Sequence, residues 1–402
     1  MKHMQISLLL CTAALLPLLT GCGGRQAADT GLVSVQYEKL PQGEDFLLSD
    51  LVGEPEFIAL DSSDPEALVS GGDVTVSDHY IGVYSSRENT FKIFDRATGK
   101  FLYNVGNIGR GPGEYLGISF AQIDETGGKI WISTLYTNNI YSYDIGTGHF
   151  SEELPLAFKG NGNGNQGYNF MVDSKARTVT IAGIPYEADC PVAWCQDMQG
   201  NVIWEIPKTG TAPENAMLRL QTSLNADGIL DICQWSMNTQ QDTLFIIQDR
   251  ELRPLLTMKL GETTEPNVLS LDDGSYLHEP FILPDYAVVN INKMEMVRST
   301  GTDSGVNMSM QLDIQPAIIL DLRTGEVSRR TIIDDILTND ETGPTFKNGY
   351  FIRNLSAADF METGPEFLEK GKLGSSARNR ISTILENMSE EDNNVIILAP
   401  LK

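Results

Sequence analysis

The chain of 402 residues is poor in histidine and cysteine, with four of the first and five of the second. Cys11 and Cys22 lie near the N-terminus, which leaves Cys190, Cys195 and Cys233 for the rest of the chain. Three cysteines cannot make a disulfide-rich scaffold, so a hydrophobic core must hold the fold. Cys190 and Cys195 are close enough in sequence to form a bridge; the alternative is three small buried thiols.

Common catalytic motifs are absent. The sequence has no His-Glu-x-x-His, no Gly-x-Ser-x-Gly and no Gly-Lys-Ser/Thr. One Gly-x-Gly-x-x-Gly pattern occurs at Gly162, Gly164 and Gly167, but a strand is expected after it and no helix could hold a pyrophosphate there. Its asparagines resemble a calcium loop, yet Val172 stands where a bidentate glutamate is needed. We interpret the segment as a loop.

Metal-binding residues are scattered along the sequence. The histidines beyond the N-terminal segment are His79, His149 and His278, so a zinc site or a histidine base would require tertiary convergence. Two acidic pairs, Asp272-Asp273 and Asp334-Asp335, could contribute to a calcium site, whereas the other interpretation is solvated turns. The sequence predicts no cofactor, leaves calcium open and identifies no metal ligands.

Positive charge is also scarce, with 29 lysines and arginines against 54 aspartates and glutamates and a net charge of −25. Such a balance repels nucleic acid and anionic lipid headgroups. It therefore excludes a charge-driven nucleic-acid partner and favours cationic partners.

Only one long apolar run is present, from Ile6 to Leu19, and it follows the basic start Lys2-His3. The run is typical of a signal peptide and short for a membrane span, which needs ~20 apolar residues. It ends in Leu19-Thr20-Gly21-Cys22, which resembles a bacterial lipobox. The alternative is an ordinary signal peptide with an incidental cysteine.

The lipobox resemblance implies that residues 1–21 are removed and that Cys22 carries a diacylglycerol and an acyl chain such as palmitate. Two or more chains anchor a protein stably to a membrane that it does not span. Residues 22–44 would then be a lipidated tether. No acidic cluster of the kind typical of surface export follows in Gly23–Ala28, which favours a protein facing the periplasm.

An internal repeat indicates the fold. Residues 91–100, 140–149 and 317–326 each read as a strand, the motif Asp-x-x-Thr-Gly and a second strand. In this hairpin the aspartate accepts hydrogen bonds from the turn and glycine supplies the positive φ. With fainter copies, the aspartates fall at 95, 144, 197, 249 and 321, a spacing near 50 residues with one interval of 72. That spacing is typical of a propeller blade of four antiparallel strands.

We therefore predict an all-β, six-bladed β-propeller of four-stranded antiparallel blades over residues 45–402, with seven blades as the alternative. Val395–Leu398 is expected to pair with Glu56–Leu60 and close the ring, which removes an open edge. The polar stretch Ser299–Gly305 in the long interval is expected to be an inserted loop.

A short helical insertion is predicted near the C-terminus. Ser356 can cap a helix together with Asp359 three residues later. Further on, Ile381, Ile384, Leu385 and Met388 fall on one helical face. We expect this face to pack on the last blade; docking of a partner is the alternative.

A resemblance to a known family rests on two segments. The run from Asn104 to Tyr115 contains Gly-x-Gly-Pro-Gly-Glu-Tyr, and the C-terminus has an acidic-Asp-Asn stretch at Glu390–Asn394, a strand and a terminal Lys402. Both resemble the six-bladed β-propeller lipoproteins of Bacteroidetes, although Asn394 stands where proline is common. The resemblance implies a propeller fold, lipid anchoring and export, and supplies no catalytic residues.

The glycine-rich block is the one candidate binding segment. Gly109, Gly111 and Gly113 allow unusual backbone angles and Pro112 stiffens the turn, so these four are the structural residues. The candidate binding residues are Arg110, Glu114 and Tyr115. Arg110 could pair with Glu114 or meet an anionic ligand in the central channel. The other interpretation is a connection between blades that is held by its own hydrogen bonds.

These features favour a non-catalytic binding module, anchored in the cell envelope, for an envelope protein, a peptide or a glycan. The alternative is a propeller hydrolase or lactonase with a metal held by acidic and asparagine side chains in the central channel. A third hypothesis is a purely structural lipoprotein of a larger complex. Because propellers host many unrelated functions, the fold alone does not choose between them.

Overall fold

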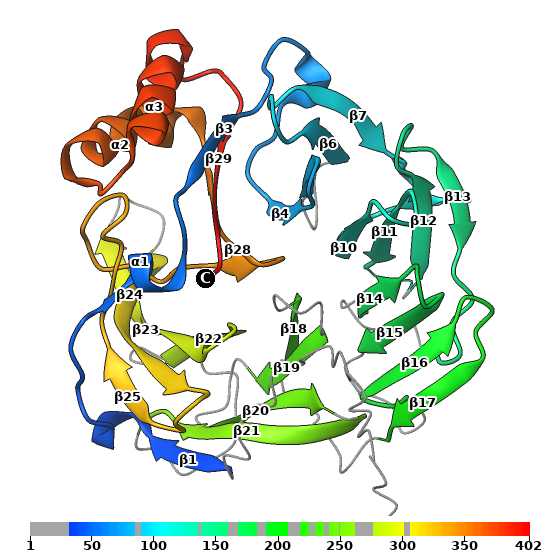
Figure 1. The fold of residues 1–402 in the computed structure, drawn as a ribbon, viewed down its shortest axis with the longest axis horizontal. Helices are drawn as coiled ribbons and strands as arrows, with labels where there is room; N and C mark the ends of the chain where they lie inside the picture. The colour runs from blue at the N-terminus through cyan, green and yellow to red at the C-terminus, as the bar shows by residue number, and fades with distance from the viewer. Residues whose placement is uncertain are drawn as a thin grey trace, which may run out of the picture.

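Antiparallel sheets of consecutive strands repeat along the chain and stand side by side around a common axis (Figure 1). The computed structural model describes residues 32–84, 90–135, 137, 139–159, 168–182, 190–207, 218–224, 230–236, 241–248, 250–261, 276–300 and 306–402. Five four-stranded sheets and a sixth blade, whose four strands fall into two sheets, form the ring, so the predicted six-bladed β-propeller is confirmed.

The first three blades follow one another without crossovers. Blade one contains β4 (Asp73–Val76), β5 (Tyr80–Tyr84), β6 (Phe91–Asp95) and β7 (Phe101–Val105). Blade two contains β10 (Ile118–Asp124), β11 (Lys129–Thr134), β12 (Ile140–Asp144) and β13 (Phe150–Glu153). Blade three contains β14 (Asn169–Asp173), β15 (Thr178–Ala182), β16 (Ala193–Asp197) and β17 (Val202–Ile206).

The last three blades include the strand that closes the ring. Blade four contains β18 (Leu218–Leu224), β19 (Leu230–Ser236), β20 (Gln241–Gln248) and β21 (Glu251–Lys259). Blade five contains β22 (Tyr276–Ile282), β23 (Tyr286–Thr300), β24 (Val306–Asp321) and β25 (Val327–Arg330). Blade six contains β27 (Phe346–Lys347), β28 (Tyr350–Leu355), β29 (Val395–Pro400) and, from the other end of the chain, β3 (Glu56–Ala59).

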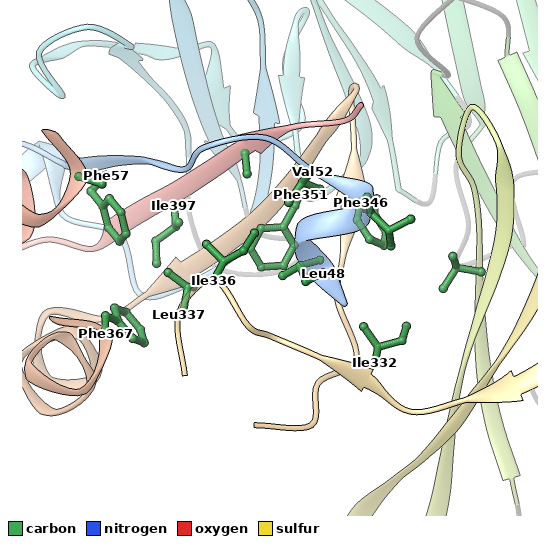
Figure 2. Packing of buried hydrophobic residues seen from close by; sticks show 14 of the residues in the cluster. Leu48, Val52, Phe57, Ile332, Ile336, Leu337, Phe346, Phe351, Phe367 and Ile397 are labelled. Atoms are coloured by element: carbon green, nitrogen blue, oxygen red, sulfur yellow. The ribbon is translucent and has the colours of Figure 1, made fainter. Parts of the chain in front are cut away.

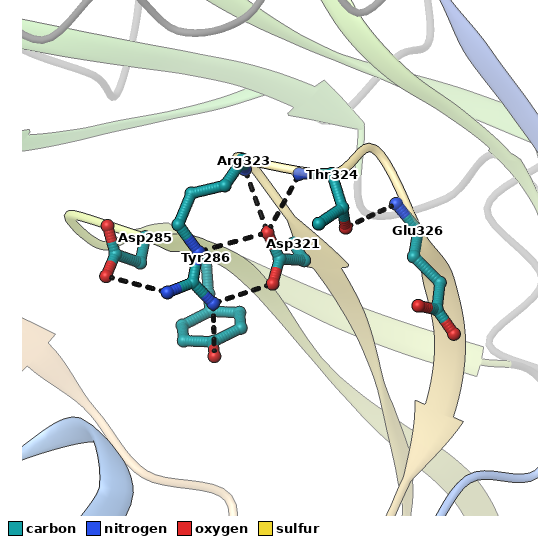
Figure 3. Close-up of polar contacts among 6 residues, drawn as sticks. All are labelled: Asp285, Tyr286, Asp321, Arg323, Thr324 and Glu326. Atoms are coloured by element: carbon teal, nitrogen blue, oxygen red, sulfur yellow. Dashed lines mark hydrogen bonds and ion pairs between the residues drawn. The ribbon is translucent and has the colours of Figure 1, made fainter.

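The Asp-x-x-Thr-Gly hairpins are built as the sequence predicts. Asp95 accepts hydrogen bonds from the Thr98 N–H at 2.9 Å and from the Thr98 hydroxyl at 2.6 Å, and Gly99 has a φ of +75°. In blade five, Asp321 accepts in addition from the guanidinium of Arg323, which also reaches the Tyr286 hydroxyl (Figure 3). The Arg323 bond holds the pKa of Asp321 down at about 2.

These hairpins also join neighbouring blades. The Gly99 carbonyl of blade one accepts a hydrogen bond from the N–H of Asp61, which follows β3 of blade six, at 2.9 Å. The Gly148 carbonyl of blade two accepts in the same way from the Gly106 N–H at the end of blade one. A Cβ at Gly99 would lie 2.0 Å from the Ala59 carbonyl oxygen, so only glycine fits this contact.

Ring closure follows the predicted pairing. β29 pairs antiparallel with β3 in a register that sets Ile397 opposite Phe57, and with β28 on its other side. The last strand therefore lies in the middle of a sheet whose outer strand comes from the start of the domain. Because β3 continues along the chain into β4 of blade one, the hydrogen bonds between β29 and β3 close the ring within blade six.

Two helices form the C-terminal insertion and lie outside blade six: α2 (Ala357–Lys370) and α3 (Ser375–Asn387) (Figure 1). Ser356 caps α2 by accepting from the Asp359 N–H at 3.1 Å, as predicted. Ile381 and Ile384 of α3 are buried against blade six, with Leu385 and Met388 packed beside them. The expected packing is confirmed, and each buried side chain of this size contributes ~1.5–3 kcal/mol.

The same hydrophobic cluster includes α1 (Leu48–Leu51). Figure 2 shows that Leu48 of α1 packs with Phe351 of β28 and with Ile336, which precedes β27 of blade six in the chain. The cluster continues to Phe367 of α2, which is fully buried. The N-terminal part of the domain, the helical insertion and blade six therefore share one core.

Residues 33–44, which the sequence places in the tether, lie along the ring. β1 (Val33–Gln36) pairs in parallel with β21 of blade four. The Tyr37 side chain is buried, and its hydroxyl donates to the Pro316 carbonyl of blade five at 2.8 Å. Beyond it, β2 (Phe46–Leu47) pairs with β26 (Ile332–Ile333). In the described part of the chain no helix has the length and apolarity to cross a membrane.

The interval in blade five is long because β23 continues to Thr300 and β24 begins at Val306. Of the expected loop, Ser299 and Thr300 belong to β23, whereas residues 301–305 lie outside the described part, where the loop stays a prediction. In blade three, Cys190 and Cys195 are both buried and Cys195 is a free thiol, so the bridge between them does not form. Cys233 has no described side chain.

Candidate functional site

The glycine-rich block connects blade one to blade two. Its ends form two short parallel strands, β8 (Asn107–Ile108) and β9 (Glu114–Tyr115). The Glu114 carboxylate accepts from the Gly111 N–H at 2.7 Å. A Cβ at Gly109 would lie 2.0 Å from a Glu114 carboxylate oxygen. Glu114 is therefore folded back onto its own turn.

Tyr115, the third candidate, is 3% exposed. Its hydroxyl donates to the Val105 carbonyl at 2.6 Å and accepts from the Phe91 N–H at 3.1 Å, and burial raises its pKa to about 12. Gly113 has a φ of +71°, and its carbonyl accepts a hydrogen bond from the Tyr143 hydroxyl of blade two. Arg110 and Pro112 are exposed at the tip of the turn. The block thus holds two blades together. Of the three candidate binding residues, Arg110 is the exposed one, and its contact with a ligand stays a prediction.

The acidic pair Asp334-Asp335 is buried, which corrects the expectation of a solvated turn. The Asp334 carboxylate accepts from the Leu337 N–H and pairs with Arg353 at 3.2 Å. Burial raises the pKa of Asp334. The hydrophobic residues on either side of this pair place it beneath the helical insertion, where its charges need protein partners.

Asp335 joins three segments. It accepts from the N–H and hydroxyl of Ser49 at 2.9 and 2.7 Å, and its other partner is the Lys372 ammonium at 2.9 Å. Burial alone would raise the pKa of Asp335, but the Lys372 and Ser49 hydrogen bonds outweigh it and lower the pKa. Both carboxylates therefore serve the fold.

Other candidate metal ligands do not meet. His79, His149 and His278 lie on blades one, two and five. Within the residues that the structure describes, no three His, Cys, Asp or Glu side chains come together as a metal site. Asp272-Asp273 and the glycines at 162, 164 and 167 lie outside those residues. Calcium in the channel stays an untested prediction.

A lysine from blade six contacts two other blades. Lys347 of β27 donates to the Tyr84 hydroxyl of blade one at 3.0 Å, and its ammonium lies 5.8 Å from the Phe120 ring centre in blade two. Burial opposes its charge, but Tyr84 and Asp73 outweigh burial and raise the pKa of Lys347. This cation therefore joins three blades.

A cavity lies elsewhere, where α3 meets blades six and one. It encloses about 790 Å³. One wall is the start of β3 with the residues before it, another is the first turn of α3, and the third is the hairpin turns of blade one. Its lining residues are Glu54, Pro55, Glu56, Phe57, Ile58, Asp78, Arg96, Ala97, Tyr350, Ser376, Ala377 and Arg380. We call this cavity the β3 groove.

Arg96 is fixed at the base of the β3 groove. Its guanidinium donates to the Ser77 carbonyl and the Tyr350 hydroxyl, both at 3.0 Å, and pairs with Glu56 at 3.0 Å. It also stacks on the Tyr350 ring, 4.7 Å from the centroid. Burial disfavours the charge, but the bonds to Tyr350 and Glu56 prevail and raise the pKa of Arg96. The groove therefore has a rigid, charged base.

Arg380 of α3 crosses the β3 groove at its other side. Its Nε donates to the Phe57 carbonyl at 3.1 Å, while the side chain remains exposed. Beyond Arg380 a second cavity of about 230 Å³ continues along β3 toward Ser62 and Asp392. The two cavities thus follow the outer edge of one strand.

Sequence reasoning did not find this site. The residues of the β3 groove come from positions 54–58, 78, 96–97, 350 and 376–380. The sequence singled out two of these segments, as a closing strand and as a hairpin, but not as parts of a binding site. Ring closure and the docking of α3 bring them together. The sequence did show the Asp-x-x-Thr-Gly turn that contains Arg96. It did not show that β3 and α3 would lie opposite this turn.

The blades, the closing strand and the connecting turns define the chain as a six-bladed β-propeller. Residues 33–400 match the model of a family described as "Domain of unknown function (DUF4934)", so the chain belongs to this family.

Solved structures resemble the whole domain. One is a "Putative exported protein" of Bacteroides fragilis, with a TM-score of 0.58 and 13% identity over 92% of this chain and 100% of that one. Another is a member of the DUF4221 family from Bacteroides vulgatus, with a TM-score of 0.46 and 8% identity over 88% of this chain and 97% of that one. The first likeness supports the fold. No curated protein matches the chain.

Proposed function

We propose that this protein is a non-catalytic binding module of the bacterial cell envelope and that its partner binds in the β3 groove. The observation that carries the proposal is the groove itself: about 790 Å³ of space between a strand edge and a helix, lined by ionised side chains on rigid elements. Ligand sites are concave and combine apolar walls with a few fixed polar groups.

Anchoring and location are part of the proposal. The sequence Leu19-Thr20-Gly21-Cys22 supports removal of residues 1–21 and lipid attachment at Cys22. The name of the Bacteroides fragilis protein supports export. We place the propeller on the periplasmic side of a membrane, held by residues 22–32, with a protein, a peptide or a glycan as the partner.

Thermal melts of the mature chain carrying Cys22→Ser test this function. The melts are run with EDTA, with calcium, and with panels of peptides and glycans. A ligand at about 100 times its Kd adds ~2.7 kcal/mol to the free energy of unfolding, so binding shifts the midpoint. We expect a peptide or glycan to raise the midpoint in the parent chain.

Ser376 of α3 lines the β3 groove, whereas the preceding Ser375 does not, and both are exposed. The Ser376→Trp variant should lose the ligand-induced shift and Ser375→Trp should keep it. A midpoint that EDTA lowers and calcium restores, together with substrate turnover by the purified protein, would instead support the metal-dependent hydrolase or lactonase.

A further inference from the structure

No strand in the described part of the chain pairs with the outer edge of β3. The direction of its hydrogen-bonding groups follows from the pairing on the other side. The Leu60 N–H donates to the Asn394 carbonyl across the β29 pairing. In an antiparallel pair, residues alternate between those that bond to the partner strand and those that point away. Two and four residues before Leu60, Ile58 and Glu56 therefore face β29, whereas Phe57 and Ala59 face outward.

A second observation agrees with this assignment. Arg380 Nε donates to the Phe57 carbonyl from the groove side, so that carbonyl does point away from β29. The N–H of Phe57 shares the direction of its carbonyl and faces the β3 groove. Toward Asp61 the edge is closed by the hairpin of blade one, where Gly99 accepts the Asp61 N–H. The free stretch is thus the part of β3 that lines the groove.

Unpaired strand edges bind extended peptides by adding them as a further strand, with main-chain hydrogen bonds for affinity and side-chain pockets for specificity. Residues 54–58 span about 17 Å at ~3.4 Å per residue, which suits a segment of about five residues. Arg380 holds one acceptor of this edge through a single hydrogen bond from an exposed side chain, so a peptide N–H can replace it.

The charges along this edge favour a cationic segment. Four carboxylates line the two cavities, from Glu54, Glu56, Asp78 and Asp392, against the two guanidiniums of Arg96 and Arg380. Arg96 is already neutralised by Glu56, and both arginines donate to main-chain carbonyls. The net charge of −25 on the whole chain adds a long-range attraction for cations.

We infer that the β3 groove takes an extended, lysine- or arginine-containing peptide segment of a partner protein, which pairs with the outer edge of β3 at Phe57. This inference rests on the proposed binding function and names the class of its partner. The peptide lies between α3 and the hairpin turns of blade one, with its cationic side chains toward Asp78 and Glu54. On binding, its main chain displaces the Arg380 guanidinium from the Phe57 carbonyl.

The test begins with a displayed library of random peptides of about twelve residues, selected on the mature chain with Cys22→Ser and counter-selected on the same chain with Ser376→Trp. Enriched peptides should be rich in lysine or arginine and poor in proline. Synthetic copies should bind the Ser376→Trp variant at least tenfold more weakly than the Ser375→Trp control. The Asp78→Lys variant should weaken them about fivefold and Glu362→Lys, the same change on exposed α2, should not.

Amide hydrogen exchange separates strand addition from other modes of binding. Peptide pairing slows exchange of the Phe57 N–H, whereas contact through side chains alone leaves it unchanged. Acidic enriched peptides, an unprotected Phe57 N–H, or no enrichment against Ser376→Trp would each overturn the inference. The proposed binding function would survive those results if a glycan from the thermal panel raises the midpoint of the parent chain but not that of Ser376→Trp. If no glycan does so, the proposed binding function falls together with the inference.

Discussion

The hairpin glycines offer a graded test of how neighbouring blades are joined. Gly99, Gly148, Gly200 and Gly128 all have φ values between +65° and +88°. They differ in the space for a Cβ: the nearest main-chain oxygen of the preceding blade would lie at 2.0 Å for Gly99, 2.4 Å for Gly148 and 3.1 Å for Gly200, and nothing lies within 4 Å for Gly128. Alanine at each therefore adds the same backbone strain and a different clash.

The strain of a left-handed alanine is about 1–2 kcal/mol, which is the whole cost expected for Gly128→Ala. Overpacking adds about 1–3 kcal/mol where the neighbour cannot move, and the Ala59 carbonyl next to Gly99 belongs to the closing strand β3. Gly99→Ala should therefore lower the free energy of unfolding by about 2–5 kcal/mol. Gly148→Ala should cost nearly as much, and Gly200→Ala only slightly more than the Gly128→Ala control.

Urea unfolding followed by circular dichroism and tryptophan fluorescence measures the four variants on one scale, because the midpoint moves with stability when the slope is unchanged. Equal losses in Gly99→Ala and Gly128→Ala would refute the reasoning, since the backbone strain would then explain everything. Losses of stability that do not follow the order of the Cβ distances would refute the claim that the contact between blades sets the cost.

Three further predictions follow from single contacts. Asp335→Ala should lower the free energy of unfolding by about 1–3 kcal/mol in chemical denaturation, because the Ser49 N–H and hydroxyl lose their buried acceptor; a change within error would contradict this role. The hydrogen bond to Glu125 raises the pKa of His79 in the folded protein. The parent should therefore have a higher Tm than Glu125→Gln below about pH 6.5, the pKa of histidine in the unfolded chain, and this difference should fade as the pH rises through the pKa of His79 in the folded protein. An NMR titration that gives the same His79 pKa in both proteins would contradict it. An alkyne-tagged palmitate should label the parent in cells and not Cys22→Ser, and equal labelling would rule out the predicted anchor.

The sequence was informative wherever a local pattern carries its own physical reason. Asp95, Thr98 and Gly99 form their turn through contacts within a few residues, so the motif predicts both the hairpin and the blade spacing. Ser356 and Asp359 predict a cap for the same reason. The pairing of β29 with β3 was predictable because a ring with one unmatched strand at each end must close.

Features that depend on distant segments were missed. Asp334 and Asp335 read as a polar turn, because nothing nearby announces Arg353, Lys372 and Ser49, the partners that allow their burial. The long interval in blade five was assigned to the polar run Ser299–Gly305, but the strands β23 and β24 account for much of its length. Such features follow from tertiary contacts, which local spacing does not encode.

The candidate site shows the same limit. The block at Gly109–Tyr115 stood out because its composition is unusual. In the structure its Glu114 and Tyr115 make hydrogen bonds that hold the connection between blades one and two. The β3 groove has ordinary residues in unremarkable local sequence, and Arg380 reaches Phe57 from 323 residues away. Only the closed ring with α3 in place creates the cavity.

Photo-crosslinking in cells tests the central claim most directly. A photoreactive amino acid is placed at position 376, inside the β3 groove, or at position 375, just outside it. A binding module with its partner in the groove predicts a defined crosslinked product from position 376 that is absent from position 375 and that the Asp78→Lys change weakens. No product at either position, or the same product at both, would contradict the account.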